Sequence, residues 1–143
     1  MDAVINGHQM NKRYLIIILS ALMILGCSHR AKYIEPTKEG MGWATIEGST
    51  KFYVALLRTT PIVIDNGLII NTFVKHRITP GHHNILINYA ISGAWFPYMQ
   101  HYSVGIMAES NHQYITRGNF WGTEKVWVED IDNPKIRWKG EEQ

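Results

Sequence analysis

From Gly42 onward the chain is divided into short segments rich in β-branched and aromatic residues, separated by glycine, proline and asparagine. Residues 83–91 and 103–108 alternate apolar and polar positions, which is the period of a strand with one buried face. No window of about ten residues after Gly42 shows the apolar stripe of an amphipathic helix. The other predicted strands cover residues 43–47, 52–57, 62–64, 68–74, 114–117, 126–130 and 136–138. Seven to nine short strands predict an all-β fold, a small antiparallel β-sandwich over residues 42–140.

Three connections between these strands have their own signals. Asn66-Gly67 tolerates the positive φ angles of a tight hairpin. In Pro80-Gly81 the proline fixes φ and the glycine permits positive φ, so a type II turn is expected to lead into the next strand. Residues 109–111 are polar and are expected to connect two strands. These motifs specify the fold and need no catalytic explanation.

Residues 1–26 have the features of a signal peptide. Lys12 and Arg13 precede an uncharged run, residues 14–26 (YLIIILSALMILG), which ends in the small residue Gly26. The run is shorter than the roughly 20 residues needed to span a bilayer, but it has the length of a secretory h-region. Met10 begins a compact signal peptide by itself, which favours Met10 as the start of translation.

The end of this run resembles the lipobox of bacterial lipoproteins. Gly26 precedes Cys27, the single cysteine of the chain. The resemblance implies cleavage between Gly26 and Cys27, a lipid on the Cys27 thiol and a membrane anchor carrying palmitate-type chains. Serine rather than aspartate at position 28 implies the outer membrane of a Gram-negative cell, facing the periplasm. An ordinary signal peptide, or an uncleaved anchor with a chance cysteine, is the alternative.

The segment after the cysteine is predicted to be a linker. Residues 28–40 contain one strongly apolar residue, Ile34, and a proline, Pro36. Such a stretch buries too little apolar surface to offset its ordering entropy. Residues 27–41 are therefore expected to form the lipidated N-terminus and a flexible tether, with a reach of roughly 40 Å.

Several motifs of the predicted domain occur in a familiar order. They are Ala44–Gly48, Val63–Gly67, Pro80–Ile87, Ile106–Tyr114 and Val126–Asp130. Together they resemble small bacterial lipoproteins of unknown function with a PEGA-like β-sandwich domain, which show a strand ending in Asp-Gly, a Pro-Gly-x-His turn, an Ala-Glu-x-x-His-x-Tyr segment and a late Trp-x-Glu-Asp. The resemblance implies the same fold and an envelope location. Asn66, inserted between Asp65 and Gly67, and the aromatic segment 92–102 depart from this pattern.

Composition excludes or disfavours several functions. Fourteen Lys and Arg against twelve Asp and Glu give a net charge of +2, too little for a nucleic-acid surface. The domain contains no Gly-x-Ser-x-Gly and no phosphate-binding glycine loop, and its carboxylates Glu129 and Asp130 should diverge on a strand. We therefore expect no enzyme activity; a small periplasmic hydrolase would need a histidine and a carboxylate around one pocket.

No metal site or cofactor is predicted either. A metal needs three or four converging ligands, and the adjacent His82 and His83 should point to opposite faces of a strand. The default role of the domain's histidines is to stabilise turns by hydrogen bonds. They are His76, His82, His83, His101 and His112.

Aromatic residues provide the candidate interaction patch. It comprises Trp95, Phe96, Tyr98, Tyr102, Phe120 and Trp121. Exposed apolar clusters mark contact sites, here for an envelope protein, a glycan or a lipid, whereas a loop folded over one end of the sandwich is the alternative. The function expected is that of a lipid-anchored envelope protein with a non-catalytic binding or structural module. The alternative is a docking component of an envelope machine such as type VI secretion.

Overall fold

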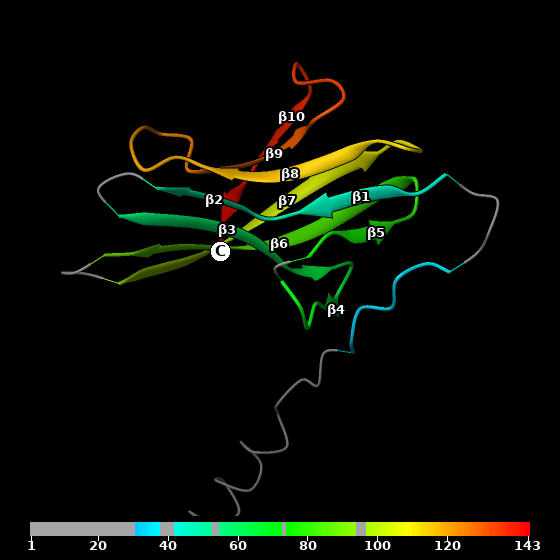
Figure 1. Cartoon of the computed structure of the whole chain (residues 1–143), viewed down its shortest axis with the longest axis horizontal. Coiled ribbons are helices and arrows are strands. Elements are labelled where there is room, and N and C mark those ends of the chain that lie inside the picture. The colour runs from blue at the N-terminus through cyan, green and yellow to red at the C-terminus, as the bar shows by residue number, and fades with distance from the viewer. Residues whose placement is uncertain (1–30, 38–41, 53–54, 73, 94–96) are drawn as a thin grey trace, which may run out of the picture.

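The computed structural model describes residues 31–37, 42–52, 55–72, 74–93 and 97–143 (Figure 1). These residues form strands, turns and loops, so the predicted all-β class is confirmed for them. The predicted signal peptide, its cleavage site at Gly26 and Cys27, and Trp95 and Phe96 lie outside the described residues. Within the described ranges, no helix is long and apolar enough to cross a membrane.

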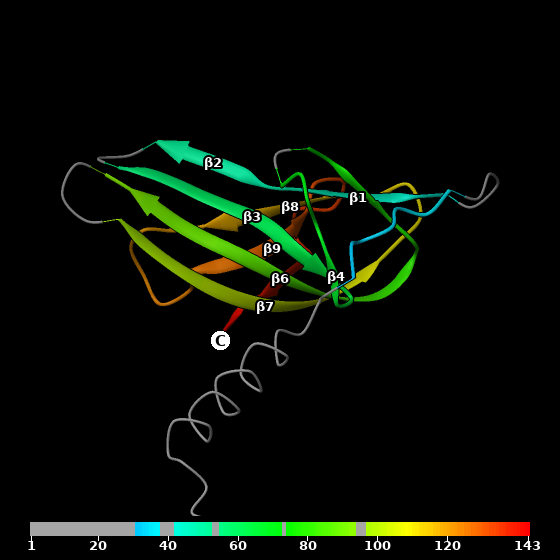
Figure 2. The same cartoon turned by 90° about the horizontal axis from the view of Figure 1, so that it is seen from below.

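The strands form two sheets (Figures 1 and 2). The five-stranded sheet has the order β10-β9-β8-β1-β5. Its strands are β1 (Ala44–Glu47), β5 (His76–Ile78), β8 (Gln113–Gly118), β9 (Val126–Asp130) and β10 (Arg137–Lys139). The six-stranded sheet has the order β11-β7-β6-β3-β2, with β4 paired to β3. Its strands are β2 (Ser49–Phe52), β3 (Leu56–Ile64), β4 (Gly67–Leu68), β6 (Gly81–Ser92), β7 (Tyr98–Ala108) and β11 (Glu141–Glu142).

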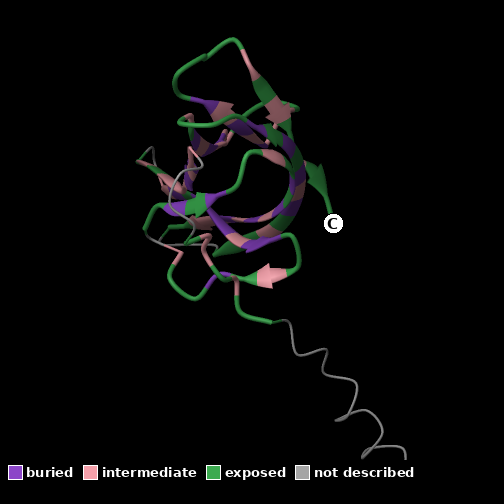
Figure 3. Ribbon diagram, turned by 90° about the vertical axis from the view of Figure 1, so that its right-hand side faces the viewer, coloured by how far each residue is buried: buried purple, intermediate pink, exposed green. Residues whose placement is uncertain are grey.

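The core lies between the two sheets, as the alternating burial along the strands shows (Figure 3). In β6, Ile85, Ile87 and Tyr89 are buried while Asn84 is exposed, which confirms the period of two read from the sequence. Both sheets contribute aliphatic side chains to the core. They include Ile46, Ile78, Val126 and Val128 from one sheet and Leu57, Ile64, Val104 and Ile106 from the other.

Two glycines allow the chain to pass from one sheet to the other. Gly48 separates β1 from β2, and Gly140 separates β10 from β11. A Cβ on Gly48 would lie 2.7 Å from the carbonyl oxygen of Thr59, and one on Gly140 would lie 3.1 Å from that of Val126. The backbone of Thr59 thus leaves no room for a side chain at Gly48, and the contact at Gly140 would be tight.

The number and direction of the strands differ from the prediction. Eleven strands are present in the described residues, against the seven to nine expected. The expectation of antiparallel pairing is wrong for β1 and β8, which are parallel, with Thr45 opposite Gln113. The chain passes through the other sheet between these two strands. Their relative direction is therefore not set by a hairpin.

Two strand boundaries predicted in the first half are wrong. The predicted strands 52–57 and 62–64 leave Thr59-Thr60-Pro61 between them, but these three residues lie inside β3. The register of β3 on β6 shifts between Pro61 and Val63, and such a bulge accommodates a proline that cannot donate a ladder hydrogen bond. Conversely, residues 52–57 include the end of β2 and the start of β3, not one continuous strand.

The segment between β3 and β6 also differs. Of the described residues of the predicted strand 68–74, only Leu68 belongs to a strand, β4, where it pairs with Val63. The chain then forms β5 at His76–Ile78, which was not predicted. Residues 98–102 of the expected aromatic loop belong to β7, because they pair with β6 up to Ile91. The long β6–β7 hairpin therefore extends further than its alternating core segment indicated.

The predicted turns are confirmed with one refinement. A two-residue turn joins β3 to β4, and its positive φ angles of 47° and 70° belong to Asp65 and Asn66 rather than to Gly67. Two successive positive φ angles fit a type I′ hairpin turn. Gly81 has a φ of 126° and opens β6 as expected, and residues 109–112 connect β7 to β8.

Candidate functional site

One end of the two sheets, which we call the aromatic end, contains the end of β2, the start of β3, the end of β6, the start of β7 and the β8–β9 connection (Figures 1 and 2). Its described aromatic residues are Phe52, Tyr89, Tyr98, Tyr102, Phe120 and Trp121. They come from both sheets, although they are distant in sequence. The fold therefore places the described part of the first aromatic cluster, Tyr98 and Tyr102, at the same end as Phe120 and Trp121.

A pocket of about 180 Å³ opens at this end. It is lined by Tyr89, Ile91, Tyr98, Tyr102, Phe120 and Lys125. The Tyr89 ring makes two edge contacts, with its centroid 6.1 Å from that of Tyr98 and 5.8 Å from that of Tyr102. Such edge-to-face pairs stabilise an aromatic cluster beyond its buried area.

Hydrogen bonds hold the β8–β9 loop over this pocket. The Tyr89 hydroxyl donates to the carbonyl oxygen of Asn119 at 3.1 Å, which joins the six-stranded sheet to the loop. The loop is closed by the Asn119 amide, which donates to Lys125 O at 2.9 Å, and by the Lys125 amino group, which donates to Phe120 O at 3.1 Å. Burial, followed by the neighbouring Tyr102 and Tyr98, raises the pKa of Tyr89, so its hydroxyl remains a donor.

The predicted patch residues fall into different environments. Tyr98 and Phe120 line the pocket at intermediate or high exposure, and Trp121 is 72% exposed against the edge of Phe120. Tyr102 is buried, so it belongs to the core rather than to an exposed surface. Phe52, which is 81% exposed on β2, and Lys125 were not predicted, because each lies outside the two aromatic runs of the sequence.

The aromatic end can bind a ligand by stacking. Tyr98, Phe120 and Trp121 offer aromatic faces or edges, and Lys125 adds an amino group at the pocket. These groups suit the ring of a sugar or an aromatic side chain of a protein, both of which combine an apolar face with polar edges.

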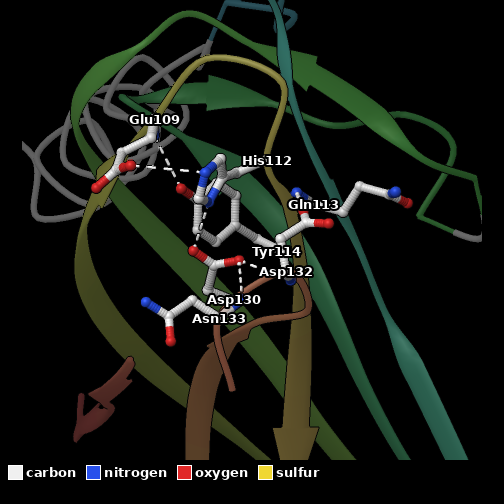
Figure 4. A network of polar contacts seen from close by, with 7 residues as sticks. All are labelled: Glu109, His112, Gln113, Tyr114, Asp130, Asp132 and Asn133. Carbon is white, nitrogen blue, oxygen red and sulfur yellow. Dashed lines mark hydrogen bonds and ion pairs between the residues drawn. The ribbon is translucent and has the colours of Figure 1, made fainter. Parts of the chain in front are cut away.

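A polar cluster, the His112 network, is shown in Figure 4. It joins the β7–β8 connector, which lies at the opposite end of the sheets from the aromatic end (Figure 1). The His112 Nδ1 donates to Asp130 Oδ2 at 2.7 Å, and its Nε2 lies 3.6 Å from Glu109 Oε2. Asp130 is 1% exposed, and its Oδ1 accepts from the amides of Asp132 at 2.9 Å and Asn133 at 3.2 Å. The network thus ties the β7–β8 connector to the end of β9.

The carboxylates around His112 raise its pKa. The hydrogen bond to Asp130 is the largest cause, burial opposes it, and the charges of Asp130, Glu109 and Asp132 act in the same direction as the hydrogen bond. The protonated ring is therefore favoured in the folded protein.

The same geometry limits the chemistry of this cluster. Ligand atoms of His112, Asp130 and Asp132 lie within 4.8 Å of one another, as metal ligands would. However, the Nδ1–Oδ2 distance of 2.7 Å leaves no room for an ion bonded to both atoms at about 2.0–2.2 Å in a tetrahedral site, so metal binding would have to break this hydrogen bond. In a nucleophilic triad the Nε2 would face a hydroxyl, but here the carboxylate of Glu109 lies nearby.

Two further histidines hold connections in the same manner, as the sequence predicted. His76 Nδ1 lies 3.0 Å from Glu35 Oε1 and its Nε2 lies 2.6 Å from Asn71 O. His83 Nδ1 lies 2.5 Å from Asp65 Oδ2 and its Nε2 lies 2.6 Å from Thr79 O.

Two neighbouring pairs also diverge as predicted. His82 is exposed beside the buried His83. Glu129 lies 3.6 Å from Arg117, whereas Asp130 contacts His112.

Residues 31–37, which fall in the predicted linker, are attached to the domain. The Tyr33 amide donates to Leu68 O and the Leu68 amide donates to Ala31 O, each at 2.8 Å, so this segment pairs with β4. The Tyr33 hydroxyl donates to Arg77 O at 2.8 Å, and Glu35 lies 3.2 Å from Arg77 as well as contacting His76. Low apolar content does not reveal this attachment, because the contacts are mainly hydrogen bonds and ion pairs.

No protein-family model, curated protein or solved structure matches this chain.

Proposed function

We propose that this protein is a lipid-anchored lipoprotein of the bacterial cell envelope. Its palmitate-bearing anchor would be Cys27, left at the N-terminus after cleavage behind Gly26, in the outer membrane and facing the periplasm. The observation that carries the proposal is the position of the chain's single cysteine directly after the uncharged run 14–26. In support, Ala31 and Tyr33, which follow Cys27 by only four and six residues, form backbone hydrogen bonds with Leu68 of β4, so the domain starts close to the proposed anchor.

Incorporation of labelled palmitate tests the anchor. The full chain is expected to incorporate label in a Gram-negative host, and Cys27→Ala is expected to lose it. Cys27→Ser serves as a closer control in size and polarity. Label that persists in both variants would contradict the assignment, as would an unlabelled, uncleaved wild-type protein.

The domain itself is proposed to be a non-catalytic β-sandwich that binds a partner through its aromatic end. The pocket beside the exposed Trp121 supports a binding role, because two separate sequence segments converge there. A glycan or an envelope protein are the partners of suitable chemistry. For this module we propose no reaction, cofactor or metal, and the carboxylate near His112 Nε2 disfavours the hydrolase alternative.

A docking role in an envelope machine such as type VI secretion is the second candidate, favoured by the exposure of Trp121 and Tyr98 at one end. A photo-crosslinking residue at Trp121 separates the candidates. One defined protein adduct in cells favours the machine, whereas glycan-dependent protection of Trp121 without a protein adduct favours the glycan. The same crosslinker at Met107, which is exposed near the other end of β7, is the matched control.

A further inference from the structure

Four exposed apolar side chains surround the point where the chain enters the domain, and we call them the apolar rim. They are Ile34, Leu68, Ile70 and Val74. Ile34 is 83% exposed and Ile70 is 69% exposed, although both are large aliphatic residues. Apolar side chains grouped in this way on a domain surface commonly mark a contact surface.

The rim borders a hollow rather than a flat surface. A pocket of about 480 Å³ is lined by Ile34, Ile70 and Val74 together with Lys32, Ile69 and His76. Lys32 adds a cation beside the apolar groups, whereas the Glu35 carboxylate is paired with His76 and Arg77. An apolar surface with a lysine at its margin suits the boundary between acyl chains and anionic headgroups.

The length of chain before Ala31 determines what can cover this rim. Only residues 28–30 separate Cys27 from Ala31. Four links of at most about 3.6 Å each keep Ala31 within roughly 14 Å of Cys27. Because Ala31 and Tyr33 form hydrogen bonds with Leu68, a rim residue, the apolar rim lies close to the end of this short link. A domain held this closely to a lipidated cysteine has the bilayer as its nearest neighbour.

We propose that the apolar rim contacts the lipid surface and orients the domain on the membrane. This inference rests on the proposed anchor at Cys27. Residues 31–37 hold the domain in a fixed position relative to the anchor, because Tyr33 and Glu35 bind Arg77 and His76 of β5. The aromatic end lies at the other end of β3, a nine-residue strand about 30 Å long, and so points away from the bilayer.

A fluorescent thiol label at Ile70→Cys tests the contact in the full, processed protein. The lipid occupies the sulfur of Cys27, so the introduced cysteine is the reactive thiol. Proteoliposomes contain phosphatidylethanolamine with a minority of phosphatidylglycerol. An environment-sensitive label at position 70 is expected to shift to the blue and to be quenched several-fold more by nitroxide-bearing lipid than the same label at Met99→Cys. Met99 is exposed on β7 near the aromatic end.

The double variant Val74→Asp and Ile34→Asp places charges in the apolar rim. Both side chains are exposed and neither belongs to the core, so the fold should tolerate the change. The lipid quenching at position 70 is expected to be lost in this background, while the melting temperature stays close to that of the parent.

Mass spectrometry of the same preparation distinguishes a failure of the proposed anchor at Cys27 from a failure of the proposed rim contact. An acylated protein whose labels at positions 70 and 99 are quenched equally overturns the rim contact and leaves the anchor. A blue shift at position 70 without lipid quenching overturns it in favour of a protein occupant. A protein without acyl mass overturns the anchor and the rim contact together.

Discussion

The aromatic end and the opposite end of the sheets organise their connecting loops by different means. At the aromatic end, Tyr89 packs against neighbouring rings and makes one hydrogen bond to the β8–β9 loop. Toward the opposite end, which we call the histidine end, His76, His83 and His112 each have both ring nitrogens close to oxygen atoms of other residues. The connections around these histidines are thus ordered mainly by polar contacts rather than by packing of aromatic rings.

The largest effect is expected from Tyr89→Ala at the aromatic end. Tyr89 is 1% exposed, so the substitution should lower the free energy of unfolding by about 3–5 kcal/mol through lost burial and the cavity left behind. Tyr89→Phe keeps the ring and loses only the bond to Asn119, at a cost of about 0.5–1.5 kcal/mol. Urea denaturation of both variants measures the difference; equal losses would show that the hydroxyl, not packing, holds this end together.

Asp130→Ala tests the histidine end and should cost about 1–3 kcal/mol. The substitution leaves His112 and the amides of Asp132 and Asn133 without their buried acceptor. Glu129→Ala is the matched control, because the neighbouring carboxylate is partly exposed and its pair with Arg117 should contribute at most about 1 kcal/mol. If both substitutions cost the same in urea, the polar network does not order this end.

His112→Gln makes the two ends differ in their response to pH. The folded-state pKa of His112 is raised above 6.5, so its contribution to stability is fully present below pH 6.5 and is lost as the pH rises through the folded-state value. The melting temperature of the wild type should therefore exceed that of the variant most on the acidic side. The comparable difference for Tyr89→Phe should not change across neutral pH. If the difference in melting temperature between the wild type and His112→Gln instead increases toward alkaline pH, the raised pKa of His112 is contradicted.

The alternation of side chains made the core strands predictable, whereas connections between the sheets were not. Ile85, Ile87 and Tyr89 follow the period of two, and Asn66 lies in the expected hairpin turn. Pro61 misled the prediction because its effect depends on a bulge against β6, which requires knowledge of the partner strand. The parallel pairing of β1 with β8 likewise depends on how the chain crosses between sheets.

The candidate site was predictable in composition but not in environment. The sequence identified Tyr98, Tyr102, Phe120 and Trp121 as an aromatic set, yet burial divides Tyr102 from Trp121. That division depends on which face of β7 meets the other sheet. The partners of the histidines could not be read from spacing, because Asp130 lies 18 residues from His112 and Glu35 lies 41 residues from His76.

The smallest effect on stability is expected from Trp121→Ala. The side chain is 72% exposed, and the bond from its backbone amide to Asn119 Oδ1 does not require the indole, so the free energy of unfolding should change by no more than about 0.5 kcal/mol. Capture of a partner through the aromatic end should nevertheless fall sharply, because the indole is its most exposed ring at the β8–β9 loop. Thermal melts and pull-down from detergent-solubilised envelopes measure the two quantities, with Met107→Ala as the exposed control. Unchanged capture together with unchanged stability would mean that Trp121 serves neither packing nor recognition. A loss of stability as large as that of Tyr89→Phe would instead assign the indole to packing.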